Sequence, residues 1–191
     1  MRKLILVRDS LPEIVPELPA NQWRLSNTGR LRCKRLAERL AAYDPNVIVA
    51  SLEPKAAETG QLVAQMLGTP FETAEGLGEH DRSNAGTLGT QEQFEARVGS
   101  FFENPQKLVF GGETADSAHR RFAKAVAAVI ERHPSGHLAV VTHGTVMTLF
   151  VACTALLDPF PFWKRLGLPS FVVLCLPDFG LLTVVESVTD D

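Results

Sequence analysis

The feature that most constrains this chain is a short apolar run near its amino terminus that ends in a charged pair. Residues 4–7 are all apolar, and Arg8 and Asp9 follow directly. A continuous apolar run of this length is typical of a buried strand in a parallel sheet. Ligands of open α/β sheets bind outside the carboxyl ends of the strands, where Arg8 and Asp9 would lie. The pair therefore marks either a ligand site or a structural ion pair, and this stretch alone does not separate the two.

Strand and helix patterns alternate along the rest of the chain. Further buried strands are predicted at residues 47–50 and 138–141, and residues 171–176 and 181–186 are typical of a hairpin or a pair of edge strands. Helices are predicted over residues 26–43, 54–67, 91–103, 114–133 and 145–157. This alternation predicts a single α/β domain over residues 1–191.

Three segments are expected to be irregular. Residues 11–27 contain three prolines, which forbid a helix and indicate an extended segment over the surface. Residues 71–89 are rich in glycine and charge and have no clear periodicity. Pro159 and Pro161 mark a loop after the last predicted helix.

Composition and charge exclude several functions. The formal net charge of −3 offers no footprint for nucleic acid or an anionic membrane. Residues 138–157 are nearly all apolar, but His143 and Gly144 interrupt them and suit a strand, turn and helix better than a membrane span. Cys33, Cys153 and Cys175 are expected to be buried residues of a reducing compartment, here the cytoplasm. The oligomeric state has no signal in the sequence.

Polar groups at three predicted strand ends can meet at one edge of the sheet. Arg8, Lys55 and His143, together with the helix amino terminus behind Gly144, would form an anion site. Phosphate suits such a site, because arginine offers a bidentate fork and lysine a point charge. Glu79, in the irregular segment, would supply an acid.

Each of these residues also has a simpler interpretation. Lys55 at a helix start is commonly a solvated surface residue, and Glu79 is commonly a surface charge. His143, between an apolar strand and an apolar helix, could be a core histidine bonded to backbone. Their shared position at strand ends favours the interpretation as an anion site over these simpler ones.

Motifs along nearly the whole chain resemble the histidine phosphatase superfamily, also called the phosphoglycerate mutase-like fold. The family opens with a strand ending in Arg-His-Gly, where this chain has Arg8, Asp9 and Ser10. Its later motifs resemble residues 25–29, 51–60, 77–79, 111–114 and 140–145. The resemblance implies a three-layer α/β/α fold with a mostly parallel central sheet flanked by helices. It also implies phosphatase chemistry on a small phosphorylated molecule, without a cofactor, as in the small phosphatase branch.

The resemblance assigns roles residue by residue. In the family, a first histidine attacks phosphorus, two arginines and a second histidine hold the phosphoryl oxygens, and a glutamate protonates the leaving group. The matching motifs imply that Arg8 and His143 bind phosphate and that Glu79 is the acid. Asp9 takes the place of the nucleophilic histidine, and Lys55 takes the place of the second arginine.

These departures leave three hypotheses open. The first is a phosphatase that uses Asp9 as nucleophile or as a base that activates water. The second is a catalytically inactive member that binds a phosphorylated ligand or a protein partner, and the third is a domain whose pocket binds nothing relevant. Asp9 adds a second carboxylate near Glu79, which would repel phosphate, and Lys55 lacks the bidentate grip of arginine. Two carboxylates without a third ligand are weak grounds for predicting magnesium.

Overall fold

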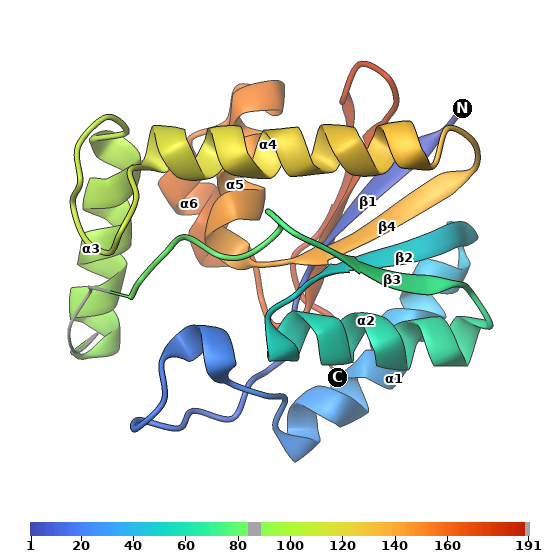
Figure 1. Cartoon of the computed structure of the whole chain (residues 1–191), viewed down its shortest axis with the longest axis horizontal. Helices are drawn as coiled ribbons and strands as arrows, with labels where there is room; N and C mark the ends of the chain where they lie inside the picture. The colour runs from blue at the N-terminus through green and yellow to red at the C-terminus, as the bar shows by residue number, and fades with distance from the viewer. Residues whose placement is uncertain (84–88, 190–191) are drawn as a thin grey trace.

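The computed structural model describes residues 1–83 and 89–189, which form one six-stranded sheet between layers of helices (Figure 1). The strands are β1 (Lys3–Arg8), β2 (Pro45–Ser51), β3 (Phe71–Ala74), β4 (His137–Thr142), β5 (Ser170–Cys175) and β6 (Leu181–Val185). The helices are α1 (Asn27–Ala41), α2 (Pro54–Leu67), α3 (Gln91–Glu103), α4 (Ala115–Arg132), α5 (Gly144–Ala155) and α6 (Pro159–Arg165), and a 3-10 turn, η1, spans Ala20–Gln22.

The sheet is mostly parallel, as predicted. Its strand order is β3-β2-β4-β1-β5-β6, and the first four of these strands run in the same direction. β5 pairs antiparallel with β1, and β6 pairs antiparallel with β5 as the second strand of the predicted hairpin. β1 and β4 lie in the middle of the sheet, with Arg8 opposite Thr142.

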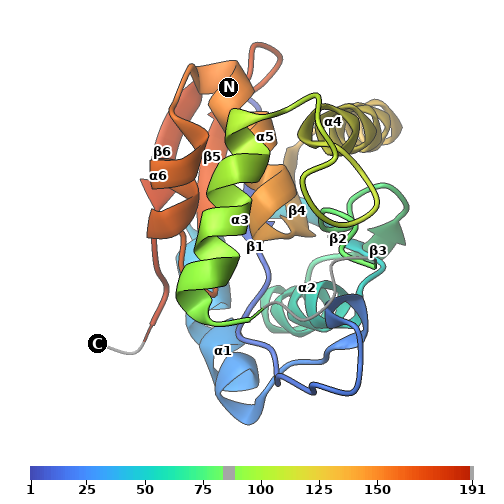
Figure 2. The same cartoon turned by 90° about the vertical axis from the view of Figure 1, so that its left-hand side faces the viewer.

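Helices cover both faces of the sheet, because successive strand side chains point to opposite sides. Leu4 and Leu6 of β1 pack in the core cluster that holds residues of α3, α4, α5 and α6. Ile5 and Val7 pack in the second cluster, which holds residues of α1 and α2. Figure 1 shows α4 and α2 on opposite sides of the sheet, and Figure 2 shows α3 beside α5 and α6. The predicted three-layer α/β/α fold is therefore confirmed.

Local signals set the ends of the helices that lead away from the site. The Ser26 hydroxyl caps α1 by accepting a hydrogen bond of 3.0 Å from the Gly29 N–H. Pro54 lies in the first turn of α2, where its missing N–H has no intrahelical partner to lose. Gly68 ends α2 with a φ of +65°, a conformation that glycine adopts without a steric cost.

Besides the short turn η1 in the segment predicted to be extended, two elements lie where the sequence predicted none. Residues 71–74 form β3, an edge strand that pairs with β2, and pairing with a distant partner leaves no local periodicity to read. The loop predicted at Pro159 and Pro161 is α6 instead. Both prolines fall in its first turn, which tolerates them, and the Asp158 carboxylate caps this turn through a 3.3 Å hydrogen bond from the Phe160 N–H.

The expectation that all three cysteines are buried is wrong for one of them. Cys33 is buried and Cys175 is half-buried, whereas Cys153 is exposed near the end of α5, where that helix turns one side to solvent. All three are free thiols. The apolar residues 138–157 divide between β4 and α5, and no helix in the described part of the chain has the length and apolarity to cross a membrane.

Candidate anion-binding site

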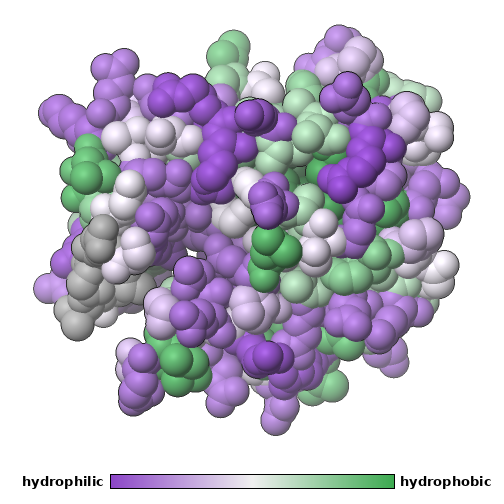
Figure 3. Space-filling model, viewed as in Figure 1, coloured by the Kyte–Doolittle hydropathy of each residue, from purple (hydrophilic) through white to green (hydrophobic). Residues whose placement is uncertain are grey.

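The carboxyl ends of β1, β2 and β4 meet at the floor of one cleft of about 1410 Å³. Figure 3 shows a hollow on this face with mostly hydrophilic side chains inside it. The cleft is lined by every residue predicted for the site, namely Arg8, Asp9, Lys55, Glu79, His143 and Gly144. The strand order explains this convergence, because β4 lies between β1 and β2.

His143 lies between two carboxylates at the centre of the floor. Its Nδ1 is 3.5 Å from Asp9 Oδ2, and its Nε2 is 3.6 Å from Glu53 Oε2. Nε2 also lies 3.0 Å from the Ser51 hydroxyl oxygen. The ring is 1% exposed, and these contacts are with side chains rather than with backbone. His143 is therefore held in place by polar groups from β1 and β2.

Arg8 and Asp9 have different partners. The Asp9 side chain is 4% exposed and faces His143, and its Oδ2 makes no hydrogen bond. The Arg8 guanidinium donates to the Leu166 carbonyl, while its buried Nε makes no hydrogen bond. Gly144 permits this placement, since a Cβ there would lie 2.9 Å from Arg8 Cζ. Burial lowers the pKa of Arg8, and the charges of Asp9 and Glu79 oppose that shift.

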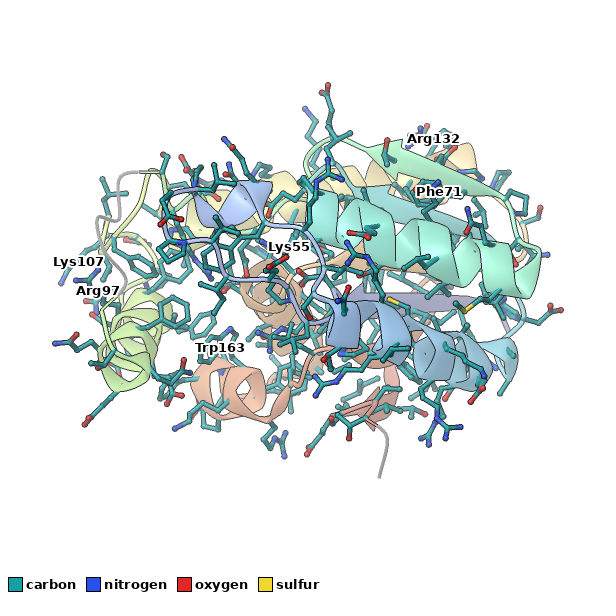
Figure 4. The ribbon with its side chains drawn as sticks, turned by 90° about the horizontal axis from the view of Figure 1, so that it is seen from below. Lys55, Phe71, Arg97, Lys107, Arg132 and Trp163 are labelled. Atoms are coloured by element: carbon teal, nitrogen blue, oxygen red, sulfur yellow. The ribbon has the colours of Figure 1, made fainter. Side chains whose placement is uncertain are left out.

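Lys55 is buried and anchored on both sides, so it is not a solvated surface residue. Its Nζ lies 3.0 Å from Glu53 Oε2 and donates a 2.8 Å hydrogen bond to the Ala20 carbonyl in η1. Figure 4 shows Lys55 beside the segment that carries η1. The ammonium thus connects the start of α2 to the proline-rich segment before α1.

Glu79 caps the helix that was expected to receive the anion. Its carboxylate accepts hydrogen bonds of 3.1 and 3.2 Å from the N–H groups of Thr145 and Val146, in the first turn of α5. Arg82 Nη2 lies 3.3 Å from the same carboxylate. Burial by itself would raise the pKa of Glu79, but Arg82, His143 and the backbone donors outweigh it and lower the pKa. Glu79 is therefore an anion at neutral pH in this structure.

Sequence reasoning missed Glu53 and Arg82 as members of the site. Glu53 follows β2 by two residues and directly precedes Pro54, and its Oε1 accepts a 2.8 Å hydrogen bond from the Glu79 N–H. Arg82 donates a 2.9 Å hydrogen bond to the Thr145 hydroxyl. The only sequence features that could have identified them are their positions. Glu53 follows a predicted strand, and Arg82 lies three residues after Glu79.

The charged groups of the floor balance formally. Three carboxylates, Asp9, Glu53 and Glu79, lie among three cationic side chains, Arg8, Lys55 and Arg82. Each carboxylate has at least one cationic or imidazole neighbour within 4 Å. Across residues 1–83 and 89–189, no cluster of histidine, cysteine and acidic side chains has an arrangement that could hold a metal ion.

Arg121, paired with Glu113, holds the loop that carries Glu79. Arg121 of α4 donates 2.9 Å hydrogen bonds to the carbonyls of Gly76 and Gly78 and a 3.0 Å hydrogen bond to the Glu79 carbonyl. Glu113 Oε1 lies 2.5 Å from Arg121 Nη2 and anchors that guanidinium. The Glu113 carboxylate is thus a positioning group for the site rather than part of its floor.

The fold is the three-layer α/β/α arrangement with a mostly parallel sheet that the resemblance implied. A family model described as "Histidine phosphatase superfamily (branch 1)" matches residues 20–176, and the chain belongs to this family. The matched range includes Lys55, Glu79 and His143 and begins after Arg8 and Asp9. No curated protein matches the chain.

Solved structures share the fold at low sequence identity. A structure titled "Mycobacterial hydrolase 2" has a TM-score of 0.76 at 19% identity and covers 100% of this chain and 92% of its own. A mycobacterial glucosyl-3-phosphoglycerate phosphatase with inorganic phosphate has a TM-score of 0.75 at 20% identity over 98% of both chains. An Entamoeba histolytica phosphoserine phosphatase with 3-phosphoglyceric acid has a TM-score of 0.75 at 18% identity over 98% of both chains.

Replacing Glu79 with Gln should destabilise the protein at neutral pH and much less in acid. The folded-state pKa of Glu79 lies below its ordinary value of 4.5, so the carboxylate adds stability above that pH, and this stability is lost as the pH falls below it. Urea unfolding should show a deficit of about 1–3 kcal/mol at pH 7 that shrinks below pH 4. Glu38→Gln, at an exposed site on α1, is the control. An equal deficit at both pH values would contradict the expectation.

Proposed function

We propose that this protein binds phosphate monoesters at the carboxyl ends of β1, β2 and β4. The observation that carries the proposal is the half-buried Arg8 side chain, which lies against Gly144 next to His143. Its Nε is buried and has no hydrogen-bond partner. A buried, unpartnered donor on a cation is costly unless a ligand satisfies it. A phosphoryl oxygen suits this donor, because guanidinium and phosphate form short, charge-assisted hydrogen bonds.

Two structural relatives support the class of ligand. The mycobacterial relative was solved with inorganic phosphate, and the Entamoeba relative was solved with 3-phosphoglyceric acid. The structural match to each of these two relatives covers 98% of the present chain and 98% of the relative. These ligands make inorganic phosphate a reasonable first probe for the present chain.

Inorganic phosphate at millimolar concentration should raise the melting temperature of the native chain by about 2–5 °C. Arg8→Lys keeps the positive charge but loses the bidentate guanidinium, so this variant should show a smaller rise in melting temperature. Arg8→Ala should show no rise. Arg30→Ala, at an exposed arginine of α1, should keep the native response. Differential scanning fluorimetry measures all four proteins. A native chain that shows no rise would contradict the proposal.

The positions of Asp9 and Glu79 support a site that binds the ester but does not hydrolyse it through a phosphohistidine. Asp9 lies where the resemblance places the nucleophilic histidine, but its carboxylate is short, 4% exposed and directed at His143. The phosphohistidine route also needs a proton for the leaving group, and this requirement is unmet. Glu79 has a lowered pKa and holds hydrogen bonds from α5, so it has no proton to donate at neutral pH.

A second candidate function, hydrolysis through Asp9, has one observation in its favour. Asp9 Oδ2 is buried, makes no hydrogen bond and lies 3.5 Å from His143. A carboxylate oxygen can attack phosphorus to give an acyl phosphate, as the alkoxide of the ester leaves, and water then hydrolyses the acyl phosphate. That route needs a proton donor for the leaving oxygen, which Glu79 does not supply in this structure.

Turnover of para-nitrophenyl phosphate separates the two functions. We expect the native chain to be no faster than Asp9→Ala, with or without magnesium. Asp9→His should gain activity by about two orders of magnitude, because it supplies a nucleophile to a pocket that still binds phosphate and because nitrophenolate is a stable anion that leaves without a proton from Glu79. Asp9→Asn is the control for a change of charge alone. Native turnover that Asp9→Ala abolishes would overturn the binding-only proposal in favour of hydrolysis.

Glu53 lies among the cationic groups that would hold a phosphate. Its Oε2 is 3.0 Å from Lys55 Nζ and 3.6 Å from His143 Nε2. A second anion at the same groups would be repelled by this carboxylate at close range. Phosphate binding therefore requires that Glu53 turn away, which weakens the affinity for phosphate.

Glu53→Gln should bind phosphate about 5–10-fold more tightly than the native chain, because the amide removes the competing charge without removing the side chain. Isothermal titration with inorganic phosphate measures the change. Glu38→Gln, far from the cleft floor on α1, should leave the affinity unchanged. Weaker binding by Glu53→Gln would mean instead that Glu53 orients Lys55 toward the ligand.

A further inference from the structure

The walls of the cleft differ in character from its floor. The floor is charged, whereas the segment before α1 contributes a wall of apolar and proline side chains. The large side chains of this wall and of the neighbouring β2–α2 connection are unusually exposed, with Ile14 68%, Leu18 43% and Leu52 58% exposed. Figure 3 shows an apolar patch below the hollow, among hydrophilic side chains.

Lys55 fixes the apolar wall in place. Its hydrogen bond to the Ala20 carbonyl ties this segment to the start of α2, beside the floor. Within the segment, the Trp23 indole N–H donates to the carbonyls of Val15 and Leu18, at 2.9 and 3.0 Å. The exposure of Ile14 and Leu18 is therefore a property of an ordered wall.

The opposite wall is aromatic. Phe94 of α3 and Trp163 of α6 line the cleft with their ring centroids 5.9 Å apart at an interplanar angle of 64°. Figure 4 shows Trp163 between α3 and α6. The Trp163 indole Nε1 is buried and makes no hydrogen bond.

Each end of the aromatic wall joins the floor through an arginine. The Arg82 guanidinium lies 4.9 Å from the centroid of the Phe94 ring and pairs with Glu79. Arg8 donates to the carbonyl of Leu166, which directly follows α6. A ligand whose anionic end reaches Arg8 would thus have its body between Phe94 and Trp163 on one side and Ile14 and Leu18 on the other.

We propose that the preferred ligand is a phosphate monoester of an aromatic alcohol. The proposal rests on the phosphate binding proposed above and adds the chemical class of the ester group. Exposed apolar side chains gathered around one cleft commonly mark a ligand site, and a few polar groups at its floor then fix the orientation. Aromatic rings suit this cleft, because rigid rings bury a large area and pack edge-to-face with other rings. A small hydrophilic ester would leave Ile14 and Leu18 in contact with water.

Three ligands test the inference by isothermal titration of the full chain: inorganic phosphate, glycerol phosphate and 1-naphthyl phosphate. We expect 1-naphthyl phosphate to bind on the order of tenfold more tightly than inorganic phosphate, and glycerol phosphate to bind no more tightly than inorganic phosphate. Equal affinity for all three ligands would overturn the inference while leaving phosphate binding intact. A chain that does not bind inorganic phosphate would overturn the proposed function itself.

Substitutions in the apolar wall test whether it causes the preference for 1-naphthyl phosphate. Ile14→Ser combined with Leu18→Ser should remove most of the preference for 1-naphthyl phosphate and leave the affinity for inorganic phosphate unchanged. Leu31→Ser combined with Leu108→Ser is the matched control, because both leucines are exposed outside the cleft. Phe94→Leu tests the aromatic wall without opening a large cavity, and it should weaken only the naphthyl ester. If 1-naphthyl phosphate binds the Arg8→Ala variant as tightly as it binds the native chain, then its binding is apolar adsorption that does not involve the phosphate site. That result would overturn the inference.

Discussion

Parallel pairing of β4 with both β1 and β2 is the constraint on which the site depends. It places Arg8 opposite Thr142, so that Asp9 and His143, the residues after the two strand ends, lie side by side. The pairing of β2 with β4 brings Ser51 and Glu53 to the other side of the same imidazole. The central residues of these strands are buried between two helical layers, so this register is held by the core rather than by the site.

The electrostatics of the floor differ from those of an open anion pocket. Glu79 occupies the first N–H groups of α5, and Glu53 lies between Lys55 and His143. Three of the groups expected to bind phosphate, namely Lys55, His143 and the amino terminus of α5, thus already face a carboxylate of the same chain. Arg8 is the exception, since its buried Nε has no hydrogen-bond partner. These contacts make phosphate recognition a competition between the ligand and internal carboxylates, with Arg8 as the group that favours the ligand.

Much of the fold was predictable because its signals are local. Apolar runs marked β1, β2 and β4, and Ser26, Pro54 and Gly68 marked helix ends through capping and turn chemistry. β3 and α6 were missed for physical reasons. The residues of β3 become a strand only by pairing with β2, and Pro159 and Pro161 are compatible with a helix only in its first turn.

The residues that end the central strands could be identified from the chain alone, and with them the convergence of Arg8, Lys55 and His143 at one edge of a sheet. Strand periodicity and chain order carry that information. Which of these groups contact one another follows from the packing of the folded chain. The positions of Glu53 against His143 and of Glu79 on α5 are long-range contacts between segments that packing brings together. Such contacts depend on side-chain direction and burial in three dimensions, which no local pattern encodes.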